Sequence, residues 1–545
     1  MRRRSLQAVA GGAISALVIA AVPSATATAH RPPAGTGKDQ GSAVTGKAIQ
    51  RHLQKFQAIA DANGGNRATA TPGYEASARY VEKTLRKAGY EPQRQYFDVE
   101  TFNVSDLRVE VPGVPLAPVA MSYSTSTDDD GVQAPLVAPT TATGCDEAAW
   151  SGVDATARIA VVSRGVCTFG QKALAAGAAG ADALIIYNNE AGPLNGTLGE
   201  VNDAYAPVVG VTQAEGEALL AALAAGEVTG SFDLQADIRT EQTFNVIAET
   251  KGGSADNVVM LGSHLDSVAD GPGINDNASG SAAILETAVQ LAKDGANKAT
   301  PSKGKPGAPK PGASKPGKKV AGKKVAKGKT VLPHVGKATK HHADKGHQAG
   351  KGSPKKLKPK NGIKNKVRFA WWGAEELGLH GSTHYVDDLK ATSPADLEKI
   401  AVYLNFDMVG STNYIIGVYD ADESTYEAPV EVPEGSVAAE KAFTDYFDAI
   451  GQPWVDTEFS GRSDYQAFIE NGVPASGLFT GADGSKTEEE VALFGGTAGI
   501  AYDPNYHTPQ DDISNVDPKA LDVNGRAIGA VVRDLARSTE AINGR

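Results

Sequence analysis

Histidines and carboxylates recur in this chain directly after short apolar segments that have the composition of buried strands, or in loops. The set consists of His264, Asp266, Asp276, Glu375, Glu376, Asp407 and His507. Nitrogen and carboxylate ligands, few in number, are what zinc requires in proteins. Because functional groups gather at the carboxyl ends of strands in open α/β sheets, we expect these side chains to converge on one site. Such a set supports metal-assisted hydrolysis.

The spacing within this set predicts different roles for its members. Asp266 lies two residues after His264, so it projects to the same side of the strand and can orient the imidazole. Asp276 lies at a turn into a helix, where its carboxylate can bridge two metal ions. The adjacent Glu375 and Glu376 point in different directions, so one can bind metal while the other stays free as a base.

Each of these motifs also has a structural interpretation when it is taken singly. A His-x-Asp at a strand end can serve packing, and a Glu-Glu pair is favourable near the positive end of a helix dipole. The pair Tyr506-His507 can be a packing pair. The ordered set is difficult to explain by chance, and we therefore interpret it as one metal site.

The elements that must position these side chains follow from the apolar pattern. With 545 residues, 41% hydrophobic and 21% charged, the chain is long enough for two or more domains and is not disordered throughout. Strand-like runs at 258–262, 367–372 and 401–406 alternate with helical segments such as 281–293. This alternation predicts an α/β fold with a mixed, mostly parallel sheet flanked by helices.

We expect this α/β domain to be built from three separate stretches, 44–105, 239–297 and 367–545. In the first stretch, Ile49, Leu53 and Phe56 recur at helical spacing. A second helix is predicted from Gly73 to 89, followed by a strand over 93–102. Two insertions, 106–238 and 298–366, separate the three stretches.

The first insertion, 106–238, is rich in Ala, Gly and Val. Its segment 158–169, followed by Lys172, resembles a protease-associated (PA) domain, a non-catalytic insert of exopeptidases and receptors that tends to border the substrate cleft. This resemblance implies a β-rich α+β domain. Cys145 and Cys167, the only two cysteines, are predicted to form a disulfide that stabilises by roughly 3 kcal/mol. Two free buried thiols are the alternative.

Six motifs carry the candidate site residues. They are Gly-Ser-His-Leu-Asp-Ser (262–267), Gly-Ile-Asn-Asp-Asn-Ala-Ser-Gly (273–280), Trp-Gly-Ala-Glu-Glu-Leu-Gly-Leu (372–379), Asn-Phe-Asp-Met-Val-Gly (405–410), Ser-Gly-Arg-Ser-Asp-Tyr (460–465) and Tyr-His-Thr-Pro (506–509). Together they resemble the secreted bacterial leucyl aminopeptidases of the co-catalytic two-zinc exopeptidase family. The resemblance covers about 44–102 and 243–545, and it implies the phosphorylase/hydrolase-like fold of zinc exopeptidases.

The resemblance also implies a role for each site residue. One zinc would take His264, Asp276 and Asp407. The other would take Asp276, Glu376 and His507, so that Asp276 bridges the two ions. Glu375 would be the general base, and Arg462 and Tyr506 would hold the substrate carbonyl or its oxyanion. Met408 and Phe479 are candidate walls of an apolar pocket for the first substrate side chain, with ordinary core packing as the alternative.

The sequence departs from this family at two places. Relatives often carry a disulfide beside the Tyr-His loop, whereas Asn505 and Gln510 stand at those positions here. Some relatives bind a structural calcium through acids of the last helix. Asp522 is present, but Arg526 occupies the second acidic position, which argues against calcium.

The N-terminus is predicted to be an export signal. Three arginines at 2–4 precede an apolar run at 8–22 and small residues at 24–29, so we interpret 1–29 as a signal peptide and 30–43 as a flexible mature N-terminus. An uncleaved anchor is the alternative, but the run is shorter than the roughly 20 residues of a spanning helix. We expect a secreted protein with no later membrane span.

The second insertion, 298–366, is strongly basic. It contains 21 lysines and one acid, Asp344, although the whole chain has a net charge of −11. Its Lys, Gly and Pro content predicts a disordered, solvated segment. Binding to an anionic polymer or cell wall, and folding back on the acidic remainder of the chain, are the alternatives.

Rival functions remain open from the sequence. A carboxypeptidase, a dipeptidase or a glutaminyl cyclase could use the same scaffold, although cyclases generally work with one metal. A non-catalytic receptor would have lost ligands, and a polyanion-binding protein would depend on the basic insertion. We predict an aminopeptidase that acts as a monomer on peptide or protein N-termini, with two zinc ions per subunit and a preference for large hydrophobic residues.

Overall fold

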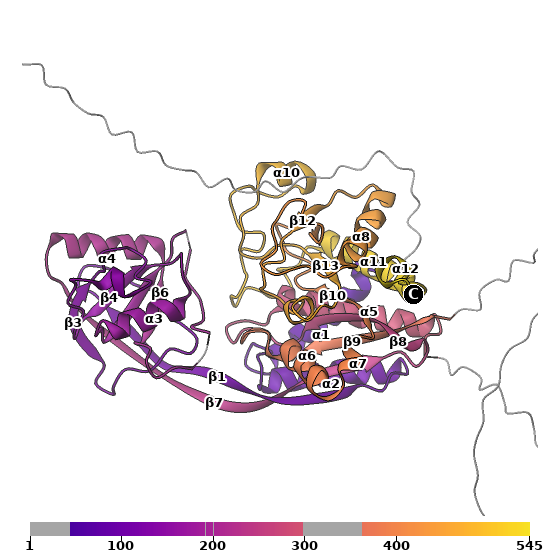
Figure 1. The fold of residues 1–545 in the computed structure, drawn as a ribbon, viewed down its shortest axis with the longest axis horizontal. Coiled ribbons are helices and arrows are strands. Elements are labelled where there is room, and N and C mark those ends of the chain that lie inside the picture. The colour runs from indigo at the N-terminus through magenta and orange to yellow at the C-terminus, as the bar shows by residue number, and fades with distance from the viewer. Residues whose placement is uncertain (1–43, 191, 200, 298–361) are drawn as a thin grey trace, which may run out of the picture.

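The computed structural model describes residues 44–190, 192–199, 201–297 and 362–545. The predicted signal peptide and flexible N-terminus lie outside the described residues, as does the basic insertion up to residue 361. Figure 1 shows two bodies joined by a long pair of strands. We call the larger one the α/β body and the smaller one, formed by residues between the two joining strands, the inserted body.

The sheet of the α/β body has parallel strands at its centre. Its strands are β8 (Ser254–His264), β9 (Asn365–Trp372), β10 (Ile400–Phe406), β11 (Gly417–Tyr419), β12 (Val455–Thr457) and β13 (Ala475–Phe479). Their order is β12-β11-β13-β10-β8-β9, and β9, β8, β10 and β13 are mutually parallel neighbours. Only the pairing of β11 with β13 is antiparallel among these six strands. The predicted α/β class with a mostly parallel sheet is therefore confirmed.

Helices cover both faces of this sheet. They are α1 (Gly46–Asp61), α2 (Pro72–Lys87), α5 (Gly280–Lys293), α6 (His380–Thr392), α7 (Pro394–Leu397), α8 (Ser436–Ile450), α9 (Gln466–Ile469), α10 (Glu488–Phe494), α11 (Pro518–Leu535) and α12 (Glu540–Asn543). Successive strand residues point to opposite faces, so Val259 and Leu261 join the core under α1, α2, α5 and α11. Met260 joins a second core under α6, α7 and α9.

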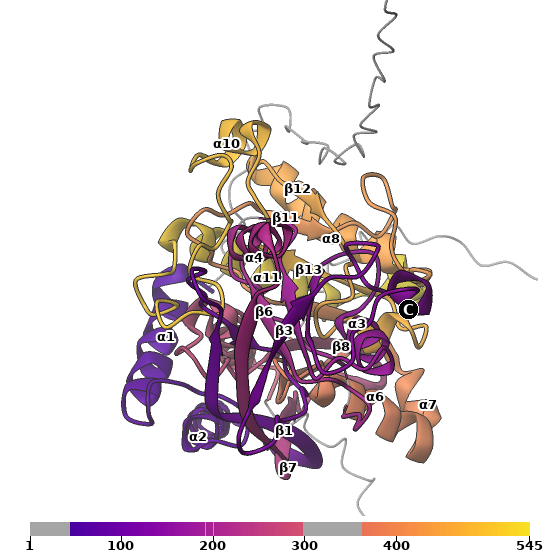
Figure 2. The ribbon, with the colours of Figure 1, turned by 90° about the vertical axis from the view of Figure 1, so that its left-hand side faces the viewer.

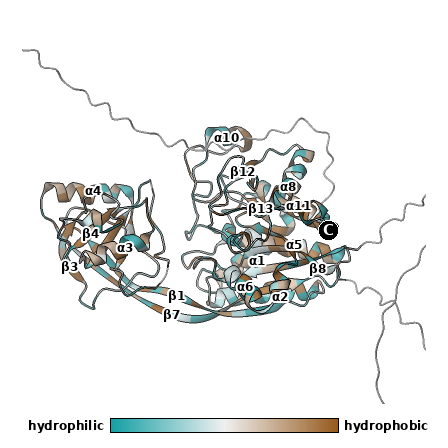
Figure 3. Cartoon of the chain, in the orientation of Figure 1, coloured by the Kyte–Doolittle hydropathy of each residue, from teal (hydrophilic) through white to brown (hydrophobic). Residues whose placement is uncertain are grey.

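The helix starts are fixed by side chains that the sequence supplies. Thr45 caps α1 by accepting a hydrogen bond from the Ala48 N–H, and Thr71 caps α2 directly before Pro72 at the first helical turn. Figure 3 shows hydrophilic and hydrophobic residues mixed along the covering helices. Among the described residues, no helix has both the length and the apolarity needed to cross a membrane.

Two long strands connect the bodies. β1 (Gln93–Glu110) and β7 (Thr229–Glu249) pair antiparallel along their whole length, from Gln93 opposite Ile247 to Glu110 opposite Ser231. We call this pair the ribbon. β7 also pairs with β9 at one end and with β3 at the other, so one strand belongs to both bodies. The strand predicted over 93–102 is therefore the first half of a longer one.

The inserted body has its own hydrophobic cores, and its strands continue the hydrogen-bonded strand order beyond β7. Figure 2 shows this body on the side that faces the viewer. Its elements are β2 (Val119–Ala120), β3 (Val132–Val137), a 3-10 helix (Glu147–Trp150), β4 (Ile159–Ser163), α3 (Phe169–Ala178), β5 (Ala183–Tyr187), β6 (Val208–Val211) and α4 (Gln213–Ala225). Tyr123 of this body donates a hydrogen bond at 3.3 Å to the Leu377 carbonyl of the α/β body. The inserted body therefore contacts the loop that carries Glu375 and Glu376.

The predicted disulfide between Cys145 and Cys167 is present in the inserted body. The fully buried Lys172 lies beside it, and its ammonium donates to the carbonyls of Thr143 and Gly165 at 2.8 and 2.9 Å. Burial lowers the pKa of Lys172 to about 8. The disulfide and Lys172 together hold the two loops at this end of the inserted body.

Replacing both cysteines by serine is expected to destabilise the inserted body by roughly 3 kcal/mol. The disulfide joins residues 22 positions apart, and its loss increases the conformational entropy of the unfolded chain. Thermal unfolding of the double variant followed by calorimetry measures this change. The site described below lies in the other body, so activity at 25 °C should stay unchanged. Equal thermal stability of variant and parent would contradict this assignment.

Candidate metal centre

The candidate ligands come together at the carboxyl ends of the central strands. His264 is the last residue of β8, Asp276 lies in the irregular segment Ile274–Ser279 with non-helical φ and ψ angles of −108° and 95°, and Asp407 directly follows β10. Glu376 lies in the loop after β9, and His507 lies in the loop before α11. Residues far apart in the sequence thus meet where parallel strands end, as the spacing predicts.

Asp276 lies between the two histidines. Its Oδ1 atom is 3.1 Å from Nε2 of His264, and its Oδ2 atom is 3.2 Å from Nε2 of His507. Each oxygen of one carboxylate therefore faces a different imidazole. This is the geometry expected of a bridging ligand between two metal ions.

The other carboxylates divide between these two halves. Oδ1 of Asp407 is 3.3 Å from Nε2 of His264, and Oε2 of Glu376 is 3.0 Å from Nε2 of His507. Within the part of the chain that the structure describes, Oδ1 of Asp407 and Oε1 of Glu376 are buried without a hydrogen-bond partner. Buried carboxylate oxygens without a partner cost free energy, and a bound cation would remove that cost.

The electrostatics of the cluster lead to the same interpretation. Burial alone would lower the pKa of His507, but Glu376 and Asp276 raise it to about 11. Burial raises the pKa of Glu376, and the nearby charge of Asp276 raises it further. Several carboxylates thus share a buried space with the two imidazoles, and the guanidinium of Arg67 interacts with the charges of Asp276 and Glu376. A divalent cation would compensate that charge while the histidines stay neutral, as metal ligands must be.

Glu375 is set apart from its neighbour. Its Oε2 atom lies 3.8 Å from Nε2 of His264, and the side chain is 9% exposed. Burial raises its pKa well above the usual range, and Asp407 adds to that effect. Glu375 and Glu376 therefore point to opposite halves of the cluster, as their adjacency predicts.

Asp266 contacts the glutamate loop as well as the histidine. Its carboxylate lies 3.7 Å from Nδ1 of His264, whereas its main-chain oxygen lies 3.2 Å from that nitrogen. The two carboxylate oxygens accept the N–H groups of Glu375 and Glu376 at 3.4 and 3.3 Å. Asp266 therefore ties the loop after β9 to the end of β8.

Two further residues support the cluster and were not predicted from the sequence. Arg67 is fully buried and donates to the main-chain carbonyls of Leu265, Pro272 and Gly273. Asp511 accepts the N–H groups of Asn275 and Asp276 at 2.8 and 2.9 Å. Both residues act on backbone groups, which leave no signal in side-chain patterns.

The backbone is unusual beside three of the site residues. Ala374, Met408 and His507 have φ values of 58°, 49° and 57°, in the left-handed region that non-glycine residues rarely adopt. Ala374 precedes Glu375 and Met408 follows Asp407. Strained conformations of this kind concentrate at functional sites, where surrounding contacts fix them.

Tyr506 directly precedes His507, and Arg462 interacts electrostatically with Tyr506. The guanidinium of Arg462 pairs with both carboxylate oxygens of Asp483 at 3.1 and 3.4 Å. The ring of Tyr506 stacks on that of His507 with centroids 3.8 Å apart. Burial raises the pKa of Tyr506 well above its usual value, and Asp276 raises it further, so its hydroxyl keeps its proton.

The remaining predicted positions are placed as follows. Met408 is 2% exposed next to Asp407, and Phe479, at the end of β13, packs against the second core. In the His507 loop, the side chain of Asn505 donates a hydrogen bond to that of Asn515 at 2.8 Å.

The position expected to bind calcium in some relatives has other partners here. Asp522 accepts a hydrogen bond from Nε of Arg526 at 2.7 Å and another from the Gly46 N–H at 2.7 Å. An arginine and a backbone amide therefore compensate this carboxylate.

A separate group of acids lies away from the metal cluster. Asp420, Asp422 and Glu440 offer oxygens within 4.8 Å of one another. Asp420 accepts the N–H groups of Ser424, Thr425 and Tyr426, and Glu440 accepts that of Ala421. These hydrogen bonds indicate that the carboxylates of Asp420 and Glu440 stabilise the backbone of the loop at 421–426.

Replacing Glu440 by Gln is expected to stabilise the protein at pH 8 but not at pH 5. Burial, opposed by the Ala421 N–H and reinforced by Asp422, raises the pKa of Glu440 from 4.5 to about 7. The charged form is therefore disfavoured in the folded state, and the cost appears as the pH rises through this window. Melting temperatures should differ by about 2–4 °C at pH 8. An equal difference at both pH values would contradict this prediction.

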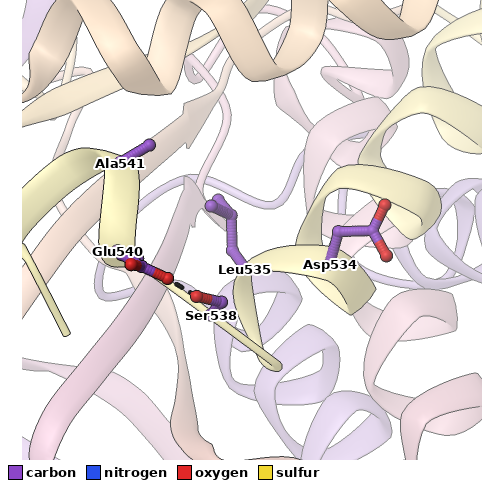
Figure 4. A pocket seen from close by; sticks show the side chains of 5 residues that line it. All are labelled: Asp534, Leu535, Ser538, Glu540 and Ala541. Atoms are coloured by element: carbon purple, nitrogen blue, oxygen red, sulfur yellow. Dashed lines mark hydrogen bonds between the residues drawn. The ribbon is translucent and has the colours of Figure 1, made fainter.

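A surface hollow of about 490 Å³ is found elsewhere. It is lined by Asp534, Leu535, Ser538, Glu540 and Ala541 near the C-terminus (Figure 4). It contains no histidine and no paired carboxylates. The hollow therefore offers none of the chemistry that the strand-end cluster offers.

A parallel sheet that carries histidines, carboxylates and a separate glutamate at its strand ends defines a metal-dependent hydrolase. The sequence matches peptidase family M28 over residues 245–303 and 354–532, and the PA domain over 132–219. It is 38% identical over 480 residues to the probable leucine aminopeptidase 2 of Aspergillus fumigatus, covering 88% of this chain and 80% of that protein. The chain therefore belongs to peptidase family M28, with an inserted PA domain, and is a metalloaminopeptidase.

Solved structures have the same architecture. The aminopeptidase from Aneurinibacillus sp. strain AM-1 aligns with a TM-score of 0.64 at 25% identity, covering 91% of this chain and 94% of that one. BSAP, a zinc aminopeptidase from Bacillus subtilis, aligns with a TM-score of 0.60 at 24% identity, covering 92% and 98%. These likenesses support the predicted fold class, including the inserted domain.

Proposed function

We propose that this protein is a secreted, zinc-dependent aminopeptidase that uses two zinc ions to remove N-terminal residues, with a preference for large hydrophobic ones. The observation that carries the proposal is the position of Asp276, whose two oxygens face His264 and His507. One ion would be held by His264, Asp276 and Asp407. The other would be held by Asp276, Glu376 and His507.

Zinc is the metal that this donor set suits best. Two imidazoles and three carboxylates, with no thiolate, match the nitrogen and oxygen ligands of hydrolytic zinc sites. The zinc aminopeptidase of Bacillus subtilis shares the fold, which supports the same choice. When bound, zinc would supply Lewis acidity that lowers the pKa of water and polarises a carbonyl.

The protein groups around the cluster would perform the remaining chemistry. Glu375 would accept a proton from the attacking water and deliver it to the departing amine, which is the work of a general base and acid. Arg462 and Tyr506 would donate hydrogen bonds to the carbonyl oxygen as its negative charge develops. Asp483 would hold the guanidinium of Arg462 through its paired contacts.

Restriction to N-termini would follow from the charge of the site. Glu375 and Asp407 both lie on the His264 half of the cluster, within 3.8 and 3.3 Å of Nε2. These carboxylates would attract a free α-ammonium group, whereas a C-terminal carboxylate would be repelled. Met408 and Phe479 are proposed as walls of the pocket for the first side chain.

The experiment is hydrolysis of leucine p-nitroanilide and its N-acetylated form, before and after chelation and after zinc is added back. Cleavage of the free amine alone, lost on chelation and restored by zinc, would support the proposal. Cleavage of the acetylated compound, or cleavage that survives chelation, would contradict it. Activity of the zinc-loaded protein only on peptides with free C-termini would indicate a carboxypeptidase instead.

A further inference from the structure

A row of buried hydrogen-bond donors ends on Asp407. We call it the donor chain, and its members are Trp372, Tyr403, Asn405 and Ser463. Trp372 Nε1 donates to Tyr403 Oη at 2.8 Å, and Tyr403 Oη donates to Asn405 Oδ1 at 3.0 Å. Asn405 Nδ2 donates to Ser463 Oγ at 2.8 Å, and Ser463 Oγ donates to Asp407 Oδ2 at 2.5 Å. The proposed catalytic chemistry uses none of these four side chains.

The direction of the donor chain is set by chemistry. An indole N–H can only donate a hydrogen bond, so the Tyr403 hydroxyl accepts from Trp372 and donates its own proton to Asn405. The amide of Asn405 then has N–H groups left for Ser463, whose single proton points to Asp407. Bonds aligned in one direction polarise one another, which strengthens the last of them.

The donor chain is enclosed in the second core. Trp372, Tyr403 and Asn405 are fully buried, and the ring of Phe468 stacks on Tyr403 with centroids 3.8 Å apart. Gly262 of β8 leaves the space that the first bond needs. A Cβ atom there would lie 2.0 Å from Tyr403 Oη and 2.5 Å from Trp372 Nε1.

The two oxygens of Asp407 have different surroundings. Oδ2 accepts the hydrogen bond from Ser463, whereas Oδ1 has no hydrogen-bond partner within the described residues and lies 3.3 Å from Nε2 of His264. A carboxylate whose one oxygen is engaged in a short hydrogen bond keeps the other for a metal ion. The hydrogen bond also fixes the rotation of the carboxylate plane.

We propose that the donor chain positions Asp407 as a metal ligand through Oδ1 alone. This inference rests on the proposed function, since it assigns Ser463 and Tyr403 as positioning residues for one of two metal sites. Partners of this kind commonly contribute 10- to 100-fold to metal affinity. The effect should fall on the half of the cluster that contains His264, because Ser463 donates to Asp407, whose Oδ1 atom faces that histidine.

The experiment measures cobalt and zinc binding to the chelated full-length protein by calorimetry and by the visible spectrum of bound cobalt. Ser463→Ala is expected to weaken one of two binding steps about 10- to 100-fold and to change the spectrum of that step only. Ser463→Thr keeps the hydroxyl and should restore both. Tyr403→Phe removes the hydroxyl at the far end and should weaken the same step by a smaller factor.

Tyr385→Phe is the matched control. Tyr385 packs in the same aromatic core, with its ring centroid 5.3 Å from that of Trp372, but its hydroxyl bonds to Arg368 outside the donor chain. It should leave both binding steps unchanged. The melting temperature of each metal-free variant separates loss of folding from loss of affinity.

The outcomes distinguish this inference from the proposed function. Two unchanged binding steps in Ser463→Ala, or an equal effect of Tyr385→Phe and Tyr403→Phe, would overturn the inference and leave the function standing. A parent protein that binds fewer than two ions would overturn the two-ion proposal itself, and this inference with it.

Discussion

Glu375→Gln is expected to lower kcat for leucine p-nitroanilide by about 10²- to 10⁴-fold while leaving the bound metal in place. The amide has the size of the carboxylate but cannot accept a proton from water. Glu375 lies 3.8 Å from His264, farther than Asp276 and Asp407, so its loss should remove little ligand strength. Steady-state kinetics together with elemental analysis of the purified variant measures both quantities.

Glu376→Gln provides a comparison for Glu375→Gln, because the two glutamates are adjacent but are assigned different roles. Glu376→Gln should reduce metal content, because its Oε2 atom lies 3.0 Å from Nε2 of His507. Glu398→Gln, an exposed glutamate before β10, should change neither quantity. A Glu375→Gln variant that keeps more than a tenth of the parent kcat would argue against its role as the base.

Asp276→Asn is expected to abolish binding of both ions and to remove activity. One carboxylate faces both imidazoles at 3.1 and 3.2 Å, so its charge is shared by the two halves of the cluster. The amide is neutral and has only one oxygen. Elemental analysis should find less than one ion per chain, whereas Asp407→Asn, which touches only the His264 half, should keep one.

Asp276→Asn should also lose the stabilisation against unfolding that metal binding provides. A ligand present at 1,000 times its dissociation constant stabilises the native state by about 4 kcal/mol. Chelation should therefore lower the melting temperature of the parent protein but not that of Asp276→Asn. A chelator-dependent shift in the variant, or two ions retained, would show that Asp276 is not the bridging ligand.

The sequence predicted the convergence of the candidate ligands better than the contacts that hold them in place. Ligand types recur after apolar runs, and the runs at 258–262, 367–372 and 401–406 lie inside β8, β9 and β10. The convergence of the ligands follows from parallel strands ending at one edge of the sheet. Periodicity and residue type are enough for this step, because they depend on local pattern.

The supporting contacts depend on which backbone groups come near in three dimensions. Arg67 reaches the carbonyls of Leu265 and Gly273, and Asp511 reaches two amides of the loop that carries Asp276. A carbonyl is present at every position, so the sequence does not mark the ones that are used. The length of β1 was also missed, since its second half pairs with β7 beyond the α/β body.

The ribbon makes the inserted body an exchangeable module. Its entering and leaving strands are hydrogen-bonded neighbours, with Val99 directly opposite Glu241. A short hairpin turn placed across such a pair would close the chain without changing the order of the central strands. Gain or loss of this module during evolution therefore requires no rearrangement of the catalytic architecture, which lets substrate access and chemistry diversify separately.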